Sequence, residues 1–277
     1  MILVTGATGN VGGELVRQLA AVGEPVRALV RDNSDRTTLP AGAETATADL
    51  GQPESLSRPL QGIRRVFLLG GQHDMPGLLG EIRRANIRHV VLLTSRSVLG
   101  GSESNAIVSM WLTSEAAVTS SGVPWTILRP SGFMSNTLEW VEQIRTGDLV
   151  RAPFPNAPIA AIDPYDIAAV ATAALTGAGH EGHAYTLSGP KAILPAERVN
   201  LLSKILGRNL RFEGLTEEEA ETELRKSHPE ELVQGFLRFF AKGEFDDSGV
   251  VPTVQEITGK TPRTFEDWAK AHERFFR

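Results

Sequence analysis

The sequence predicts an α/β fold built on a doubly wound parallel sheet, with a smaller, mostly helical C-terminal lobe. Three observations indicate this fold. Short runs rich in Val, Ile and Leu alternate with helical stretches over about the first 130 residues. The connections between them are short, so right-handed crossovers are expected. From Pro195 onward the pattern changes and is mostly helical.

The expected elements follow one another in regular order. Strands are predicted at residues 2–6, 25–31, 44–50, 64–70, 88–95, 124–130 and 183–189. Helices are predicted at 10–23, near Pro53, and at 75–86, 105–122, 132–144, 162–177, 195–207, 216–226, 229–243 and 264–276. We therefore expect a nucleotide-binding domain of residues 1–130, completed by about 162–189. Residues 131–161 and 190–277 are expected to form the smaller lobe, for a substrate or partner.

The composition excludes several classes of function. The 277 residues contain no cysteine, which rules out disulfides and thiolate metal sites. His180 and His183 flank a glycine turn without a third ligand at a suggestive spacing, so no metal site is predicted. The net charge of −5 argues against nucleic acid as a partner. Without a long apolar run we expect no membrane partner and a cytoplasmic location; the oligomeric state is left open.

The first strand is followed at once by a glycine-rich loop, GATGNVG, that opens the first helix. The glycines stand at positions 6, 9 and 12, and no lysine follows, which excludes a Walker-type phosphate loop. Gly6 would turn the chain, Gly9 would let backbone N–H groups approach a pyrophosphate, and Gly12 would let the helix lie close to the strand. This loop predicts a dinucleotide site of the Rossmann type, with the pyrophosphate at the helix N-terminus.

The end of the second strand predicts which dinucleotide binds. Arg31 stands where an arginine pairs with the 2′-phosphate of NADP. Asp32 follows it; it either accepts from the ribose hydroxyls of NAD or caps the turn DNSD. NADP(H) is therefore the preferred cofactor, with NAD(H) as the alternative. Asp49, Leu69 and Gly70 end the next two strands and are expected beside the cofactor.

Several motifs together resemble the NmrA-like family, atypical members of the short-chain dehydrogenase/reductase superfamily. They are TGATGNVG, Arg31, the TS pair at 94–95, ILRPSGFMSN at 127–136, IAAIDPYDIAAV at 159–170 and YTLSGP at 185–190. The resemblance implies a Rossmann domain, NADP(H) binding and a smaller lobe that closes a substrate cleft. Some relatives of this kind reduce quinones or other carbonyl and aromatic compounds, and others are regulators that bind dinucleotide without catalysis.

The catalytic pair usual in the wider superfamily, Tyr-x-x-x-Lys, is missing. The chain has two tyrosines, Tyr165 and Tyr185, and neither is followed four residues later by lysine. Aligned on the downstream SGVPWTILRP, the pair falls on Trp111 and Glu115. Tryptophan cannot titrate near neutral pH, and glutamate carries the charge opposite to that of lysine. Hydride transfer to an easily reduced quinone needs little acid help, so the loss leaves an enzyme possible.

The site residues expected from these arguments form three groups. The cofactor-binding residues are Gly6, Thr8, Gly9, Asn10, Val11, Gly12, Arg31, Asp49, Leu69, Gly70, Thr94 and Ser95. The candidates for catalysis are Ser95, Ser97 and Trp111, and the candidates for the substrate cleft are Trp111, Phe133, Met134 and Asn136, although core packing explains Phe133 and Met134 equally well. His73 is a further candidate, because its place after the fourth strand directs it toward the mouth of the cleft and its imidazole titrates near neutral pH. Asp163 and Asp166 are expected to cap a helix and to join the lobes. Two functions follow: an NADPH-dependent oxidoreductase of a small quinone-like or carbonyl substrate, or a non-catalytic NADP(H)-sensing protein acting through a protein partner.

Overall fold

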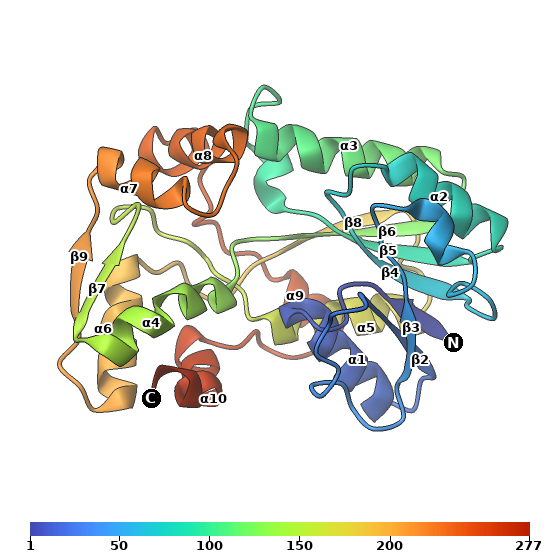
Figure 1. Cartoon of the computed structure of the whole chain (residues 1–277), viewed down its shortest axis with the longest axis horizontal. Helices are drawn as coiled ribbons and strands as arrows, with labels where there is room; N and C mark the ends of the chain where they lie inside the picture. Colours follow the sequence, from blue (N-terminus) through green and yellow to red (C-terminus); the bar gives the residue numbers. More distant parts are fainter.

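The computed structural model describes all residues 1–277 and contains a seven-stranded parallel sheet (Figure 1). The strand order is β3-β2-β1-β4-β5-β6-β8. The strands are β1 (Ile2–Val4), β2 (Val26–Val30), β3 (Glu44–Thr47), β4 (Arg65–Leu69), β5 (His89–Leu93), β6 (Trp125–Pro130) and β8 (His183–Leu187). The order reverses direction between β1 and β4, which confirms the doubly wound α/β fold and places the crevice for a ligand outside the ends of these two strands.

Helices cover both faces of the sheet (Figure 1). α1 (Asn10–Ala21) and α5 (Pro164–Thr176) lie on one face, and α2 (Met75–Arg84) and α3 (Ala106–Ser120) lie on the other. Because successive strand residues point to opposite faces, Ile2 and Val4 pack under α1 and α5 while Leu3 packs toward α2. The apolar runs seen in the sequence are therefore strands buried on both sides. None of the helices is both long and apolar enough to cross a membrane.

The smaller lobe is mostly helical but contains strands that the sequence did not reveal. Its elements are η3 (Met134–Trp140), α4 (Val141–Thr146), β7 (Leu149–Ala152), α6 (Pro195–Leu206), β9 (Arg211–Gly214), α7 (Glu217–Leu224), α8 (Glu230–Phe236), the π-helical turn η4 (Leu237–Ala241) and α10 (Phe265–Phe276). β7 and β9 form a separate two-stranded parallel sheet. The helix expected at 132–144 is divided into the 3₁₀ turn η3 and the short α4. Residues around the buried Trp268 form the core of this lobe.

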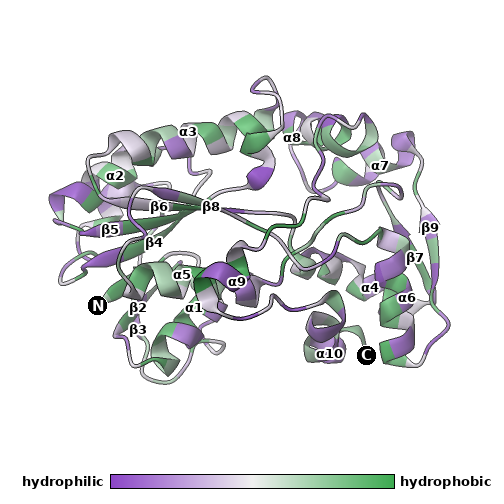
Figure 2. Cartoon of the chain, turned by 180° about the vertical axis from the view of Figure 1, so that it is seen from behind, coloured by the Kyte–Doolittle hydropathy of each residue, from purple (hydrophilic) through white to green (hydrophobic).

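One part of the C-terminal region lies on the Rossmann domain. α9 (Thr253–Thr258) packs against α5, and its Val254 belongs to the core under that face of the sheet. α5 packs against both α1 and α9, and it is hydrophobic over most of its length (Figure 2). We call the irregular segment 243–252, which leads from the smaller lobe to α9, the return segment. It makes the smaller lobe less separate than the predicted division at residue 190 implied.

Two short 3₁₀ turns follow strands of the main sheet. η1 (Pro53–Leu56) stands where a helix was expected near Pro53. η2 (Arg96–Leu99) begins three residues after the last residue of β5. Because η2 begins at the carboxyl end of a central strand, it brings its side chains to the same edge as the glycine loop.

Candidate dinucleotide-binding site

The glycine loop is so tightly built that two of its glycines leave no room for a side chain. Gly6 has φ +61°, and a Cβ there would lie 2.5 Å from Leu69 Cδ1. A Cβ on Gly12 would lie 2.1 Å from the Gly6 carbonyl oxygen. The Gly9 N–H donates to that same carbonyl at 2.9 Å, which closes the turn. The first helix therefore begins in direct contact with the loop that precedes it.

The N-terminus of α1 has free hydrogen-bonding capacity. Its N-cap residue is Gly9, and no side chain caps the helix. The first backbone N–H groups of a helix have no partner within it, and they point in the direction in which the helix dipole attracts an anion. The sequence places no acidic residue in this first turn. This end of α1 is therefore suited to hold a phosphate group.

A cleft of about 590 Å³ opens in front of this helix end. Nine of the expected cofactor residues line it: Gly6, Thr8, Gly9, Asn10, Val11, Gly12, Arg31, Asp49 and Leu69. Phe133, expected in the substrate cleft, also lines it. Gly70, Thr94 and Ser95 are not among its lining residues. The cleft thus runs from the glycine loop across the ends of β2 and β4.

Arg31 is the cation at the far end of this cleft. Its side chain is exposed and forms no hydrogen bond or ion pair, while its backbone N–H donates to Ser34 Oγ at 3.1 Å. The turn after β2 is held by Ser34, whose N–H donates to the Arg31 carbonyl at 3.0 Å. Asp32 makes no side-chain hydrogen bond, so the capping role considered for it is not seen. An unpaired guanidinium is thus available to a ligand in the cleft.

Further residues line the cleft that the sequence reasoning did not name. They are Leu29, Val30, Ser34, Ala48, Leu50, Gln72 and Leu93. Most of these residues lie beside the ends of strands that the sequence predicts. Ser34 is three residues after Arg31, and Gln72 follows the glycine pair at the end of β4, so a search of all polar residues near strand ends would have found both.

Thr94 and Glu115 form a buried polar network with Arg129. Glu115 is 6% exposed; its Oε1 accepts from Thr94 Oγ1 and from Arg129 Nε, each at 2.9 Å, and its Oε2 accepts from Arg129 Nη2 at 2.6 Å. The bidentate pair joins α3 to β6. The hydroxyl of Thr94 is therefore directed at Glu115, which explains its absence from the cleft lining.

Trp111, which the sequence alignment placed at one position of the usual pair, packs with its ring against the end of β4. A Cβ on Gly70 or Gly71 would lie 3.3 Å from Trp111 Cζ3. Ser114, on the same helix, accepts from the Gly71 N–H at 2.9 Å. α3 thus fixes the loop after β4 through an aromatic ring and a hydroxyl.

The serines after β5 differ from each other. Ser95 is half-buried and accepts from the Ser97 N–H at 3.2 Å, so its own hydroxyl hydrogen is free to donate. Ser97 is 2% exposed and its Oγ has no partner. Ser95 is therefore the better placed of the two to contact a substrate carbonyl.

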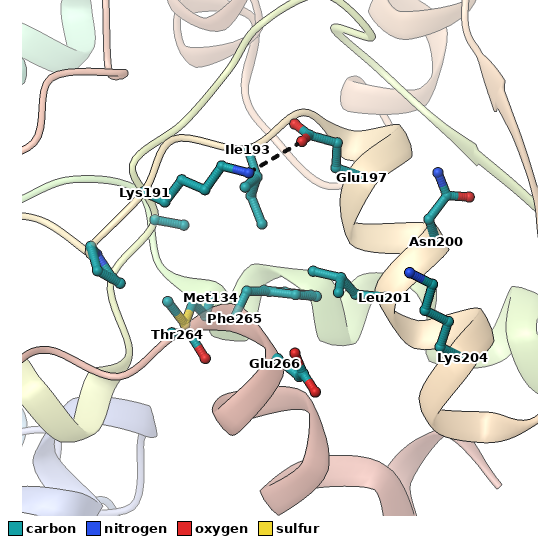
Figure 3. Close-up of a pocket in the computed structure, with 12 residues that line it drawn as sticks. Met134, Lys191, Ile193, Glu197, Asn200, Leu201, Lys204, Thr264, Phe265 and Glu266 are labelled. Carbon is teal, nitrogen blue, oxygen red and sulfur yellow. Dashed lines mark ion pairs between the residues drawn. The ribbon is translucent and has the colours of Figure 1, made fainter.

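Met134 and Asn136 occupy separate surroundings. Met134 is 2% exposed, belongs to the core of the smaller lobe, and forms a wall of a 340 Å³ pocket between α6 and α10 (Figure 3). The rim of this pocket includes Lys191 and Glu197, whose charged atoms are 3.7 Å apart. Asn136 is exposed on η3 and makes no side-chain hydrogen bond. Of the four residues expected in the substrate cleft, only Phe133 lines the cleft in front of α1; Trp111, Met134 and Asn136 do not.

Asp163 and Asp166 join the lobes. Asp163 caps α5 by accepting from the Tyr165 N–H at 2.9 Å and is 3.3 Å from Arg263 Nη1; Asp166 accepts from the Arg263 N–H at 2.7 Å. Burial raises the pKa of Asp166 to about 6. These contacts agree with the structural role expected for both.

The histidines contribute little to the cleft. His73 is exposed. His180 Nδ1 lies 3.0 Å from the hydroxyl oxygen of Tyr185, and the ring of His183 stacks on the ring of Tyr185. No cluster of three or more His, Asp or Glu side chains could hold a metal ion.

The profile of the NAD(P)H-binding family matches residues 6–178, which include the glycine loop and the cleft. The chain belongs to this NAD(P)H-binding family. The protein is 43% identical to the (4-alkanoyl-5-oxo-2,5-dihydrofuran-3-yl)methyl phosphate reductase of Streptomyces griseus, over 100% of this chain and 99% of the relative. It is 36% identical to the NAD(P)H azoreductase of Xenophilus azovorans, again over 100% and 99%.

Solved structures agree on the architecture of this NAD(P)H-binding protein. An NADPH-dependent quinone oxidoreductase from Escherichia coli, in complex with NADPH, superimposes with a TM-score of 0.80 at 22% identity, covering 99% of this chain and 100% of the other. At this identity the likeness establishes the Rossmann-type fold and its smaller lobe.

Proposed function

We propose that this protein is an NADPH-dependent oxidoreductase of the NmrA-like type that reduces a small quinone-like or conjugated carbonyl compound. The observation that carries the proposal is the cleft that joins an uncapped helix N-terminus to the unpaired guanidinium of Arg31. The two relatives spanning the whole chain are named as reductases, one of an unsaturated lactone phosphate and one of azo compounds. The NmrA-like assignment rests on the sequence motifs.

The residues present fit the dinucleotide. The glycine at position 12 lets α1 lie directly against the loop, the N-terminus of α1 would hold the pyrophosphate, and Arg31 would pair with a 2′-phosphate. When bound, NADPH supplies the hydride. Phe133 and Leu69 form apolar walls of the cleft and exclude water. Ser95 lies outside the lining, two residues beyond the cleft residue Leu93, and its free hydroxyl hydrogen is the donor we assign to a substrate oxygen.

Replacement of Arg31 tests the cofactor preference. Arg31→Ala removes the charged partner of the 2′-phosphate, so we expect NADPH affinity to fall about 10- to 100-fold while NADH affinity stays within about twofold. Both are measured by fluorescence titration. Arg58→Ala is the matched control, because Arg58 is also exposed and unpaired but lies outside the cleft. Equal affinities of the unmodified protein for NADPH and NADH would contradict the assignment.

Turnover decides whether the protein is an enzyme. We expect NADPH oxidation above the enzyme-free rate with at least one member of a panel of quinones, azo compounds and unsaturated lactones. Absorbance at the reduced-nicotinamide band measures it. Normal NADPH binding with no turnover across the panel would refute the oxidoreductase proposal.

In that case the sensing function becomes the better explanation. The observation that favours it is that Glu115, one of the two residues aligned with the usual Tyr-x-x-x-Lys pair, is held in a buried ion pair with Arg129. A sensor would bind NADPH, and a protein partner would bind its NADPH-bound form. Its mark would be NADPH-dependent protection of the return segment from proteolysis without any product formed.

A further inference from the structure

A buried ionic cluster lies between the lobes, outside the dinucleotide cleft. Arg96 is the first residue of η2 after β5, Asp247 lies in the return segment, and Arg198 lies on α6. Asp247 Oδ2 accepts from the Gly132 N–H at 2.8 Å, just after β6, and Asp247 Oδ1 is 3.4 Å from Arg96 Nε. The cluster therefore stands at the carboxyl ends of β5 and β6, the edge where α/β sheets bind their ligands.

Arg198 has no partner in this cluster. It is 6% exposed, and its Nε and Nη2 are buried without a hydrogen-bond acceptor. Asp247 Oδ1 is likewise buried without a hydrogen bond. Glu197, Asn200, Leu201 and Lys204 of the same helix face the pocket of Figure 3, whereas Arg198 is buried away from it. Buried guanidinium nitrogens left without an acceptor are costly, and they indicate a group that the protein alone does not supply.

The charges in the cluster do not balance. Two guanidinium groups face one buried carboxylate, and Asp247 forms no ion pair with Arg198 although the two interact electrostatically. Burial raises the pKa of Asp247 to about 6 and lowers that of Arg198 to about 10. The exposed Asp246 is the other acidic group that acts on Asp247. Arg96 Nη1 donates to the Gly249 carbonyl, so the donors left free are those of Arg198. A second negative charge placed between the two arginines would satisfy them.

We propose that Arg96 and Arg198 bind a phosphate-monoester group carried by the hydride acceptor, and that Asp247 occupies part of this site when no acceptor is bound. The assignment of this phosphate group to the hydride acceptor rests on the proposed function. The planar guanidinium fork matches two phosphate oxygens at once, and a dianion balances two arginines once Asp247 turns away. The backbone of the return segment stays in place, because the Ala160 N–H donates to the Asp247 carbonyl at 2.8 Å and the Val251 N–H to Ser188 Oγ at 2.9 Å.

Binding of a simple phosphate ester tests the site without turnover. With the protein saturated with NADPH, so that the cofactor cleft is filled, phenyl phosphate and benzoate are titrated by calorimetry. We expect phenyl phosphate to bind and Arg198→Met to weaken it about tenfold or more. Asp247→Asn keeps the acceptor for the Gly132 N–H but removes the competing charge, so it should tighten binding about fivefold.

The control is Arg225→Gln, which removes an arginine from an exposed ion pair far from the cluster and should change nothing. Thermal unfolding checks that each variant is folded; Arg96→Gln provides a second test if Arg198→Met is not. The site is refuted if phenyl phosphate does not bind, or if Asp247→Asn and Arg198→Met leave its affinity unchanged. Benzoate binding as tightly as phenyl phosphate would refute the assignment to phosphate.

Turnover separates this inference from the proposed function. Two unsaturated lactones are compared that differ only in a phosphomethyl or a hydroxymethyl group. We expect kcat/KM to favour the phosphate at least tenfold through KM, and Arg198→Met to remove the preference. Equal turnover of both would overturn the phosphate site and leave the oxidoreductase intact. Phenyl phosphate binding without turnover of either would refute the enzyme and leave the anion site.

Discussion

Gly12→Ala is expected to abolish NADPH binding. The new Cβ would lie 2.1 Å from the Gly6 carbonyl oxygen and 2.6 Å from its carbon, and both atoms belong to the backbone of the glycine loop. Neither can move unless α1 shifts away from the loop, which opens the cradle for the pyrophosphate. We expect a loss of affinity of about 100-fold or more, measured by fluorescence titration, and a loss of about 1–3 kcal/mol in the free energy of unfolding from overpacking.

The neighbouring glycine provides the control. A Cβ on Gly13 would lie 3.4 Å from the Ala7 carbonyl oxygen, an ordinary contact, and Gly13 sits in the same helix. Gly13→Ala should keep NADPH affinity within about threefold and raise helix stability by up to about 1 kcal/mol. NADPH binding by Gly12→Ala at the affinity of Gly13→Ala would show that close contact between loop and helix is not needed for the cofactor.

Glu115→Ala is expected to have the largest effect on stability. It leaves the Arg129 guanidinium, whose side chain is 21% exposed, without its bidentate partner. The Thr94 hydroxyl loses its shorter hydrogen bond and keeps only the one to the Leu128 carbonyl at 3.3 Å. Breaking one side of a buried ion pair costs about 3–5 kcal/mol. Urea denaturation should show this loss in the free energy of unfolding.

Two comparisons identify the cause. Glu115→Gln keeps an acceptor for Thr94 but loses the charge, so its loss should lie between that of the alanine variant and zero. The double variant Glu115→Leu with Arg129→Met removes both charges, and it should recover most of the stability. A double variant less stable than Glu115→Ala would mean that the pair stabilises the fold outright.

The parts of the fold set by local patterns were predictable. Alternating apolar runs and glycine positions fixed six of the parallel strands and the crevice, and Arg31 follows from its place after β2. These features depend on residues close together in the chain. The strand at 183–189 was also expected, and the structure pairs it with β6.

What escaped prediction depends on partners distant in sequence. β7 and β9 are four residues each, too short for a periodic signal, and are joined by the ion pair of Arg151 with Glu213. The hydrogen bond from the Thr94 hydroxyl to Glu115, 21 residues away, had no signal in the sequence either. Arg198 and Asp247 come within electrostatic range of each other only because the return segment crosses between the lobes.

The Glu115–Arg129 pair also bears on how such a chain can change over evolutionary time. A lysine at position 115 would face the guanidinium of Arg129, so this single substitution would leave two cations side by side without a counter-charge. A change of charge at position 115 is therefore tolerated only together with a change at position 129. We expect the two positions to vary as a pair among related chains.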